Sequence, residues 1–214
     1  MSNTVRGNAF LAVLCLLVSL LATAAWAEAR PVTDPKACVQ AMADAVDGAD
    51  ADSFARLVNM DAIVRQAVRD LSVLAEDPQT SQWLPPAITL MASKGGLKGD
   101  FMQNFLAQEV ENFVLWGVGS GSFAGTPSPN AYKAKGLLAP LFSMASVGRK
   151  EVTRIGVPTP NDKDSWLVPF TVHDDNGRSY DVSGIVSRVD GGYVLDGVSN
   201  MKDLILQISL EAQE

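Results

Sequence analysis

The chain has 214 residues, 47% of them hydrophobic and 19% charged, and a formal net charge of -7 at pH 7. This length is sufficient for one substantial hydrophobic core. The acidic balance argues against nucleic-acid binding, because proteins that bind phosphate backbones carry clustered Lys and Arg. Of the two cysteines, Cys15 lies in an N-terminal apolar run and Cys38 follows it. If that run is removed, an intramolecular disulfide is excluded.

The first residues have the pattern of a secretory signal peptide. Arg6 precedes an apolar run from Ala9 to Ala25, and Ala25-Trp26-Ala27 is a small-x-small cleavage site. We therefore expect residues 1–27 to be removed and the protein to be exported, to the periplasm or the medium. The mature chain, residues 28–214, is expected to be a single domain without a permanent membrane span. Retention as an anchor is the alternative, although about 17 apolar residues is near the lower limit for a span.

Residues 34–147 have mainly helical patterns. Asp34-Pro35 predicts a helix start, because Asp caps a helix well and Pro at the first position loses no hydrogen bond. The longest predicted helix runs from Asp100 to about Val118 and carries the main aromatic stripe, which includes Phe105 and Phe113. The other predicted segments are helices in 34–45, 54–76 and 86–94, a loop in 119–130 and a short helix in 137–147.

Residues 149–198 show the period-2 alternation of an antiparallel sheet of three to four strands. Its apolar face carries Trp166, Val168, Phe170 and Val172 on one strand and Tyr180, Val182 and Val186 on the next. A two-residue Asn176-Gly177 turn would place Phe170 opposite Ser183. A three-residue loop of Asp175, Asn176 and a left-handed Gly177 instead places Phe170 opposite Val182 and Trp166 opposite Val186. We favour the second register.

Two residues interrupt the strand pattern. Pro169 has no N–H for the ladder, so its strand is expected to be an edge or to bulge there. Gly184 is expected to face Val168 on the apolar side and to leave a gap in the side-chain layer. After the sheet, Asn200 is expected to cap a closing helix in 200–212. The order of elements predicts an α+β domain, in which N-terminal helices pack on a curved antiparallel sheet.

The polar residues do not form a pattern that names a reaction. Cys38 lies on an apolar helical face and His173 at a hairpin end, so we do not interpret them as a catalytic pair. One His and one mature Cys cannot build the usual zinc shell, and the acids at 162, 164, 174 and 175 lack calcium-loop spacing. We predict no catalytic residue, no metal and no cofactor.

The aromatic content of both layers suggests a binding role. We expect a small apolar or amphiphilic, lipid-like ligand to bind between the sheet and the long helix. Its predicted contacts are Phe105, Phe113, Trp166, Phe170, Tyr180, Val182 and Gly184. The alternative is a structural or protein-interaction module of the cell envelope with a fully packed core, in which Asp174-Asp175 and the loop in 119–130 contact a partner. An enzyme is the third and least favoured class.

The order of elements and the last strand, residues 192–199 (Gly-Tyr-Val-Leu-Asp-Gly-Val-Ser), resemble known families. The chain resembles the nuclear-transport-factor-2-like (cystatin-like) superfamily of cone-shaped α+β domains. It more faintly resembles the periplasmic toluene-tolerance, phospholipid-carrier family, whose final strand also ends in a Gly-Val-Ser turn before a helix. Residues 48–74 resemble exported bacterial proteins with two helices around an acidic turn. These resemblances imply an α+β fold and binding of an apolar molecule, and they carry over no catalytic residue.

Overall fold

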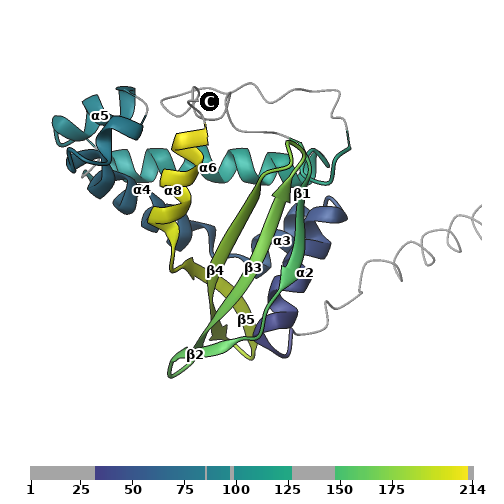
Figure 1. Ribbon diagram of the computed structural model, residues 1–214. Coiled ribbons are helices and arrows are strands. Elements are labelled where there is room, and N and C mark those ends of the chain that lie inside the picture. Colours follow the sequence, from purple (N-terminus) through teal and green to yellow (C-terminus); the bar gives the residue numbers. More distant parts are fainter. Residues whose placement is uncertain (1–31, 85, 97–98, 127–147, 212–214) are drawn as a thin grey trace, which may run out of the picture. The chain divides into compact units, whose positions relative to one another are not determined.

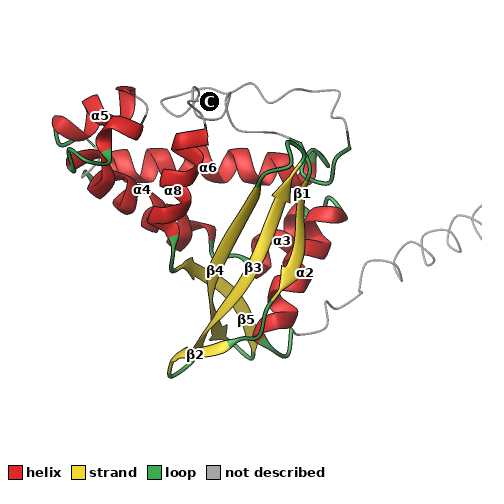
Figure 2. Ribbon diagram, in the orientation of Figure 1, coloured by secondary structure: helices red, strands yellow, loops and turns green. Residues whose placement is uncertain are grey.

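Helices come first and strands second along the chain, followed by one closing helix (Figure 1, Figure 2). The computed structural model describes residues 32–84, 86–96, 99–126 and 148–211. The helices are α2 (Pro35–Asp47), α3 (Ala51–Leu57), α4 (Met60–Glu76), the 3-10 helix η1 (Ser81–Trp83), α5 (Pro86–Ser93), α6 (Asp100–Gly119) and α8 (Met201–Glu211). The strands are β1 (Lys150–Ile155), β2 (Thr159–Asp162), β3 (Ser165–Asp174), β4 (Ser179–Val189) and β5 (Gly192–Val198). The predicted α+β class is confirmed.

Polar side chains fix the starts of the first three helices. In each case a side-chain oxygen accepts a hydrogen bond from a backbone N–H of the first turn, at 2.9 to 3.2 Å. The pairs are Asp34 with Ala37, Asp50 with Ser53, and Asn59 with Ala62. Pro35 occupies the first turn of α2, as predicted. Loss of such a cap typically costs about 1 kcal/mol.

The longest helix, α6, has its buried stripe turned slightly away from the predicted one. Leu106 is fully buried and Phe113 nearly so, whereas Phe105 is 37% exposed. With 3.6 residues per turn, positions 106, 110, 113 and 117 share a face and position 105 lies about 100° away from position 106. Phe105 therefore lies at the edge of the stripe and contributes less to the core than its apolar character suggested.

The five strands form one antiparallel sheet in the order β1-β3-β4-β5, with β2 also paired to β3. Phe170 lies opposite Val182 and Trp166 opposite Val186, so the predicted register is confirmed. Asp174 N–H donates to the carbonyl of Arg178 at 3.0 Å, which closes a three-residue loop in which Gly177 has a φ of 78°. Register shifts in β1, β2 and at the β4–β5 pair mark local irregularities that increase twist.

Pro169 lies in an interior strand, and the pairing of β3 with β4 passes through it without a register shift, so neither the expected edge strand nor the expected bulge is found there. β3 has β4 on one side and β1 and then β2 on the other. The carbonyl of Pro169 accepts from Gly156 N–H at 2.8 Å, so the missing N–H also faces that side. β1 ends at Ile155 and β2 begins at Thr159, and Pro169 is tolerated because it faces this break. The same break explains why the sheet has five strands instead of three to four.

One helix, α2, lies along one face of the sheet and contacts β1, β3, β4 and β5 (Figure 1). We call this the inner face. Cys38 and Val39 of α2 are fully buried, as are Val168 of β3 and Val186 of β4. These side chains belong to one hydrophobic cluster that continues into α4, α5 and α6. The apolar face predicted from the strand alternation is therefore the buried one.

The closing helix covers the part of β4 that extends past β5. On the N-terminal side of Gly184, where β4 is not paired with β5, the side-chain oxygen of Asn200 accepts from the N–H of Ser183 at 2.9 Å. The side-chain nitrogen of Asn200 donates to the carbonyl of Asp181 at 2.8 Å. Gln207 donates to the carbonyl of Ser179 at 3.1 Å. The side chain of Asn200, expected to cap α8, thus bonds the backbone of β4. These contacts occupy strand groups that would otherwise be open for pairing.

Three predicted segments lie wholly or partly outside the described residues. They are the signal peptide in 1–27, the second half of the loop in 119–130 and the short helix in 137–147. The contacts divide the chain into Met1–Pro31 and Val32–Glu214, and the elements above all belong to the second unit. Among the described helices, each one is too short or too polar to span a bilayer.

Candidate functional site

The seven residues predicted to contact a ligand lie in three settings. Trp166, Phe170, Val182 and Gly184 are on the inner face of β3 and β4, Phe105 and Phe113 are on α6, and Tyr180 is near the β3–β4 hairpin, where it contacts α8. The inner face is contacted mainly by α2, whereas α6 packs on α2, α3 and α4. The structure therefore brings the strand residues together but places the long helix mainly against other helices.

The side-chain layer is closed at Gly184. A Cβ atom built there would lie 2.8 Å from Leu195 Cδ1 and 3.0 Å from Phe170 Cε1. Ordinary contacts between carbon atoms are about 3.5–4.0 Å. The predicted gap opposite Val168 is thus filled by Leu195 of β5 and Phe170 of β3. Ligand capture at these residues stays a prediction.

Two of the predicted aromatic residues pack edge to face with neighbours. Trp166 lies 5.3 Å from Tyr193, with an interplanar angle of 64°. Phe113 lies 5.9 Å from Phe123, with an angle of 71°. Such pairs contribute about 0.5–1.5 kcal/mol beyond the burial of their area. Both arrangements are typical of a packed core.

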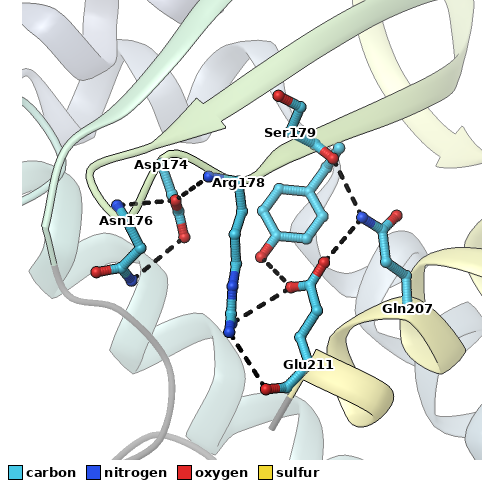
Figure 3. A network of polar contacts seen from close by, with 7 residues as sticks. Asp174, Asn176, Arg178, Ser179, Gln207 and Glu211 are labelled. Atoms are coloured by element: carbon cyan, nitrogen blue, oxygen red, sulfur yellow. Dashed lines mark hydrogen bonds and ion pairs between the residues drawn. The ribbon is translucent and has the colours of Figure 1, made fainter. Parts of the chain in front are cut away.

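A polar network joins Arg178 and Ser179 at the β3–β4 hairpin to Gln207 and Glu211 of α8 (Figure 3). Tyr180 belongs to the same network. Its hydroxyl donates to Glu211 Oε2 at 2.7 Å, and Arg178 forms an ion pair with the same oxygen at 3.4 Å. Gln207 donates to Glu211 Oε1 at 2.9 Å. Burial, followed by the bond to Glu211 and its charge, raises the pKa of Tyr180 to about 12. The network anchors the last turn of α8, and its polar groups are used internally.

A pocket of about 340 Å³ lies where α3 and the start of α4 meet α6 and the β4–β5 hairpin. We call it the β5-edge pocket. Its lining residues come from three parts of the chain that are distant in sequence. They are Ala55, Arg56, Val58, Asn59, Met60, Asp61, Glu111, Val189, Val194 and Asp196. This volume is at the lower end of the range of about 300–1,000 Å³ for small-molecule sites.

Asn59 and Asp196 form a hydrogen-bonded polar part of this pocket. The backbone N–H of Asn59 donates to the carbonyl of Leu195 at 2.9 Å. Its side-chain amide donates to Asp196 Oδ1 at 2.7 Å, and Ser187 Oγ donates to Oδ2 at 3.3 Å. The Asp196 carboxylate is therefore held in place by neutral donors, while each oxygen retains a lone pair for a further bond.

The remaining charges of the pocket are unevenly compensated. Asp61 is paired with Arg65 at 2.8 Å, and Arg56 donates to Ser53 Oγ at 2.8 Å. Within the described part of the chain, no ion pair joins Glu111 or Asp196 to a basic side chain. The pocket thus has apolar walls and two carboxylates, on α6 and β5, that can meet a positive charge.

The sequence contained only a local signal for this pocket. Asn59 ahead of an amphipathic stripe is a recognisable helix cap, but its partner Asp196 is 137 residues away. Glu111 is an exposed acid in the middle of α6. No spacing rule connects a helix cap, a mid-helix acid and a strand, so the pocket follows from tertiary packing alone.

The groups considered for catalysis have structural contacts. Cys38 is fully buried and its thiol donates to the carbonyl of Tyr193 at 3.3 Å. Burial raises the pKa of this thiol to about 11, which makes it a poor nucleophile at neutral pH. His173 contacts Ser179 Oγ at 3.3 Å on the exposed side of the hairpin. Across the described residues, no group of three or more His, Cys, Asp and Glu side chains is arranged to hold a metal.

The chain was compared with known proteins by sequence and by structure. No family model, no curated protein and no solved structure matches it.

Proposed function

We propose that this chain is an exported, non-enzymatic interaction module that binds a partner protein at the β5-edge pocket. The observation that carries the proposal is the contrast between two places on the sheet. The inner face is filled at Gly184, whereas the pocket opens at the surface with apolar walls and converging polar groups. Interfaces commonly use a small number of such pockets to receive side chains of the partner.

The size and chemistry of the pocket favour a protein partner over a lipid. About 340 Å³ accommodates one or two side chains, whereas a lipid needs a longer apolar cavity. Four of the ten lining residues are charged, which is costly for an apolar ligand to bury. A side chain of a partner can leave those charges partly in water.

The experiment is site-specific photo-cross-linking in cells that express the native gene. p-Benzoyl-phenylalanine replaces Val189, which lines the pocket and is 49% exposed. The control position is Val157, between β1 and β2, which is 78% exposed and does not line the pocket. We expect one specific protein adduct from position 189 and none from position 157. Equal adducts from both positions would argue for non-specific contacts.

Capture of a small apolar or amphiphilic ligand at Phe105, Phe113, Trp166, Phe170, Tyr180, Val182 and Gly184 stays a separate prediction, as does the resemblance to nuclear-transport-factor-2-like domains. Native mass spectrometry of gently purified protein checks the first. A bound molecule that the Gly184→Leu substitution removes would favour the ligand over the protein partner.

A further inference from the structure

We infer that the β5-edge pocket receives a basic side chain with an aliphatic stem, lysine or arginine, from the partner protein. The inference rests on the proposed function and names the chemistry of its occupant. Three features of the pocket support it: its apolar walls, its two uncompensated carboxylates and the charge of the whole chain.

The apolar walls fit an aliphatic stem. Val58 follows α3 and Met60 is the first residue of α4, and Val189 and Val194 come from the β4–β5 hairpin. Lysine and arginine bury their methylene groups along apolar surface while the charged end stays near water. An open pocket with valine walls and a polar rim suits this behaviour better than it suits a fully apolar side chain.

The carboxylates provide the charge complementarity. Asp196 is fixed by Asn59 and Ser187, so it can receive an ammonium or guanidinium group without being reoriented. Glu111 adds a second negative charge from α6. Charge-assisted hydrogen bonds of this kind are stronger than those between neutral groups.

The other charged residues of the pocket determine the sign of its net charge. Asp61 is already neutralised by Arg65, and Arg56 is the basic residue of the lining. Two free carboxylates against one guanidinium leave a net negative site. The formal charge of -7 over the chain acts in the same direction, because it attracts basic partners at long range.

The test uses two peptide probes and the full mature chain, with methyl NMR signals of Val189 and Val194 as reporters. The probes are acetyl-(Leu-Lys)3-amide and acetyl-(Leu-Glu)3-amide. We expect the lysine peptide to shift both valine signals saturably, with affinity that falls as salt is added, and the glutamate peptide to leave them unchanged.

Four variants locate the effect. Glu111→Gln and Asp196→Asn should each weaken binding of the lysine peptide about two- to fivefold, as expected for a partly exposed ion pair. Arg56→Gln should tighten it by a similar factor, because it removes the opposing charge. Asp203→Asn, which removes an acid of α8 that does not line the pocket, is the matched control and should leave the affinity unchanged. Since Asp196 also bonds Asn59 and Ser187, Glu111→Gln is the decisive carboxylate variant.

Three results would overturn the inference. The first is stronger binding of the glutamate peptide, which would assign the pocket to an acidic segment through Arg56. The second is equal weakening by Glu111→Gln and Asp203→Asn, which would show general charge attraction. The third is no valine shift with either peptide; a protein adduct from position 189 in that case would retain the proposed function and reject only the basic side chain.

Discussion

The side-chain amide of Gln66 pairs with both backbone polar groups of Val198. Nε2 donates to the Val198 carbonyl at 2.6 Å, and Oε1 accepts from the Val198 N–H at 3.1 Å. Gln66 thereby acts as a short piece of neighbouring strand at the open edge of β5. On the same strand, the Cys38 thiol donates to the carbonyl of Tyr193 and the Asn59 N–H donates to the carbonyl of Leu195. Side chains and loop backbone from the helical layer therefore cover this edge of β5 next to the pocket.

Replacing Gln66 with Met should destabilise the protein by about 1–3 kcal/mol, because it leaves a partly buried N–H and carbonyl of Val198 without partners. Chemical denaturation measures this change. Gln40→Met is the matched control, since the Gln40 amide bonds Asp44 on the exposed face of α2, and it should change stability by less than about 0.5 kcal/mol. Equal effects of the two substitutions would show that the Val198 contact contributes nothing specific.

Replacing Gly184 with Leu should lower stability by about 1–3 kcal/mol, because Leu195 and Phe170 already fill the space above it. For a chain of this size, each kcal/mol lowers the melting temperature by about 2–4 °C. Gly192→Leu is the control in the next strand, where the nearest atom to a new Cβ is the Val189 carbonyl oxygen at 3.8 Å. An unchanged or raised melting temperature for Gly184→Leu would indicate a cavity at this position after all.

Replacing Lys150 with Met should stabilise the protein at neutral pH. The Lys150 ammonium is buried without a hydrogen-bond partner among the described residues, and this burial lowers its pKa despite the attraction of Asp174 and Asp175. Because the folded protein binds this proton less tightly than the unfolded chain, stability rises with pH from the lowered pKa up to about 10.5. The substitution should therefore raise stability by about 1 kcal/mol at pH 7, with a smaller gain near pH 10.

Thermal melts across that pH range measure the Lys150 effect. Lys202→Met is the control, because Lys202 is half exposed and its contact with Asp70 is 4.0 Å long. We expect it to change stability little at any pH. A loss of stability in Lys150→Met at pH 7 would contradict the account of this residue.

Alkaline pH should destabilise the protein through Tyr180. Burial and the contact with Glu211 raise the pKa of its hydroxyl from the usual tyrosine value of 10.0 to about 12. The stabilisation is therefore fully present below pH 10 and is lost as the pH rises through 12. Tyr180→Phe should cost about 0.5–1.5 kcal/mol at pH 7 and should show a shallower alkaline loss in pH-dependent denaturation. Tyr193→Phe leaves the bond to Glu211 in place and should keep the wild-type alkaline slope.

The sheet could be predicted in detail because its determinants are local. The register depends on the loop from Asp174 to Gly177, where only a three-residue connection places Phe170 opposite Val182. The start of the first helix could be predicted from the dipeptide Asp34-Pro35. The class of fold could be predicted from the order of helical and strand patterns along the chain. Pro169 was interpreted less well, because its environment depends on where the partner strands β1 and β2 end.

The candidate site could not be predicted in this way. Phe105 and Leu106 are both apolar, and only packing decides which of the two is buried. Gly184 has no side chain, but the gap that this suggests is filled by Leu195 from another strand. The pocket itself depends on the contact between Asn59 and Asp196, which no local pattern encodes.

The most direct test of partner binding at the pocket combines the photo-cross-linker at Val189 with a substitution that fills the pocket. Ala55 lines the pocket and is exposed, so Ala55→Trp should block it without disturbing the core. Thr159→Trp adds the same side chain on exposed β2, away from the lining residues. The proposed function predicts that Ala55→Trp abolishes the adduct from position 189 while Thr159→Trp preserves it. An adduct that survives Ala55→Trp at full yield would contradict the proposal.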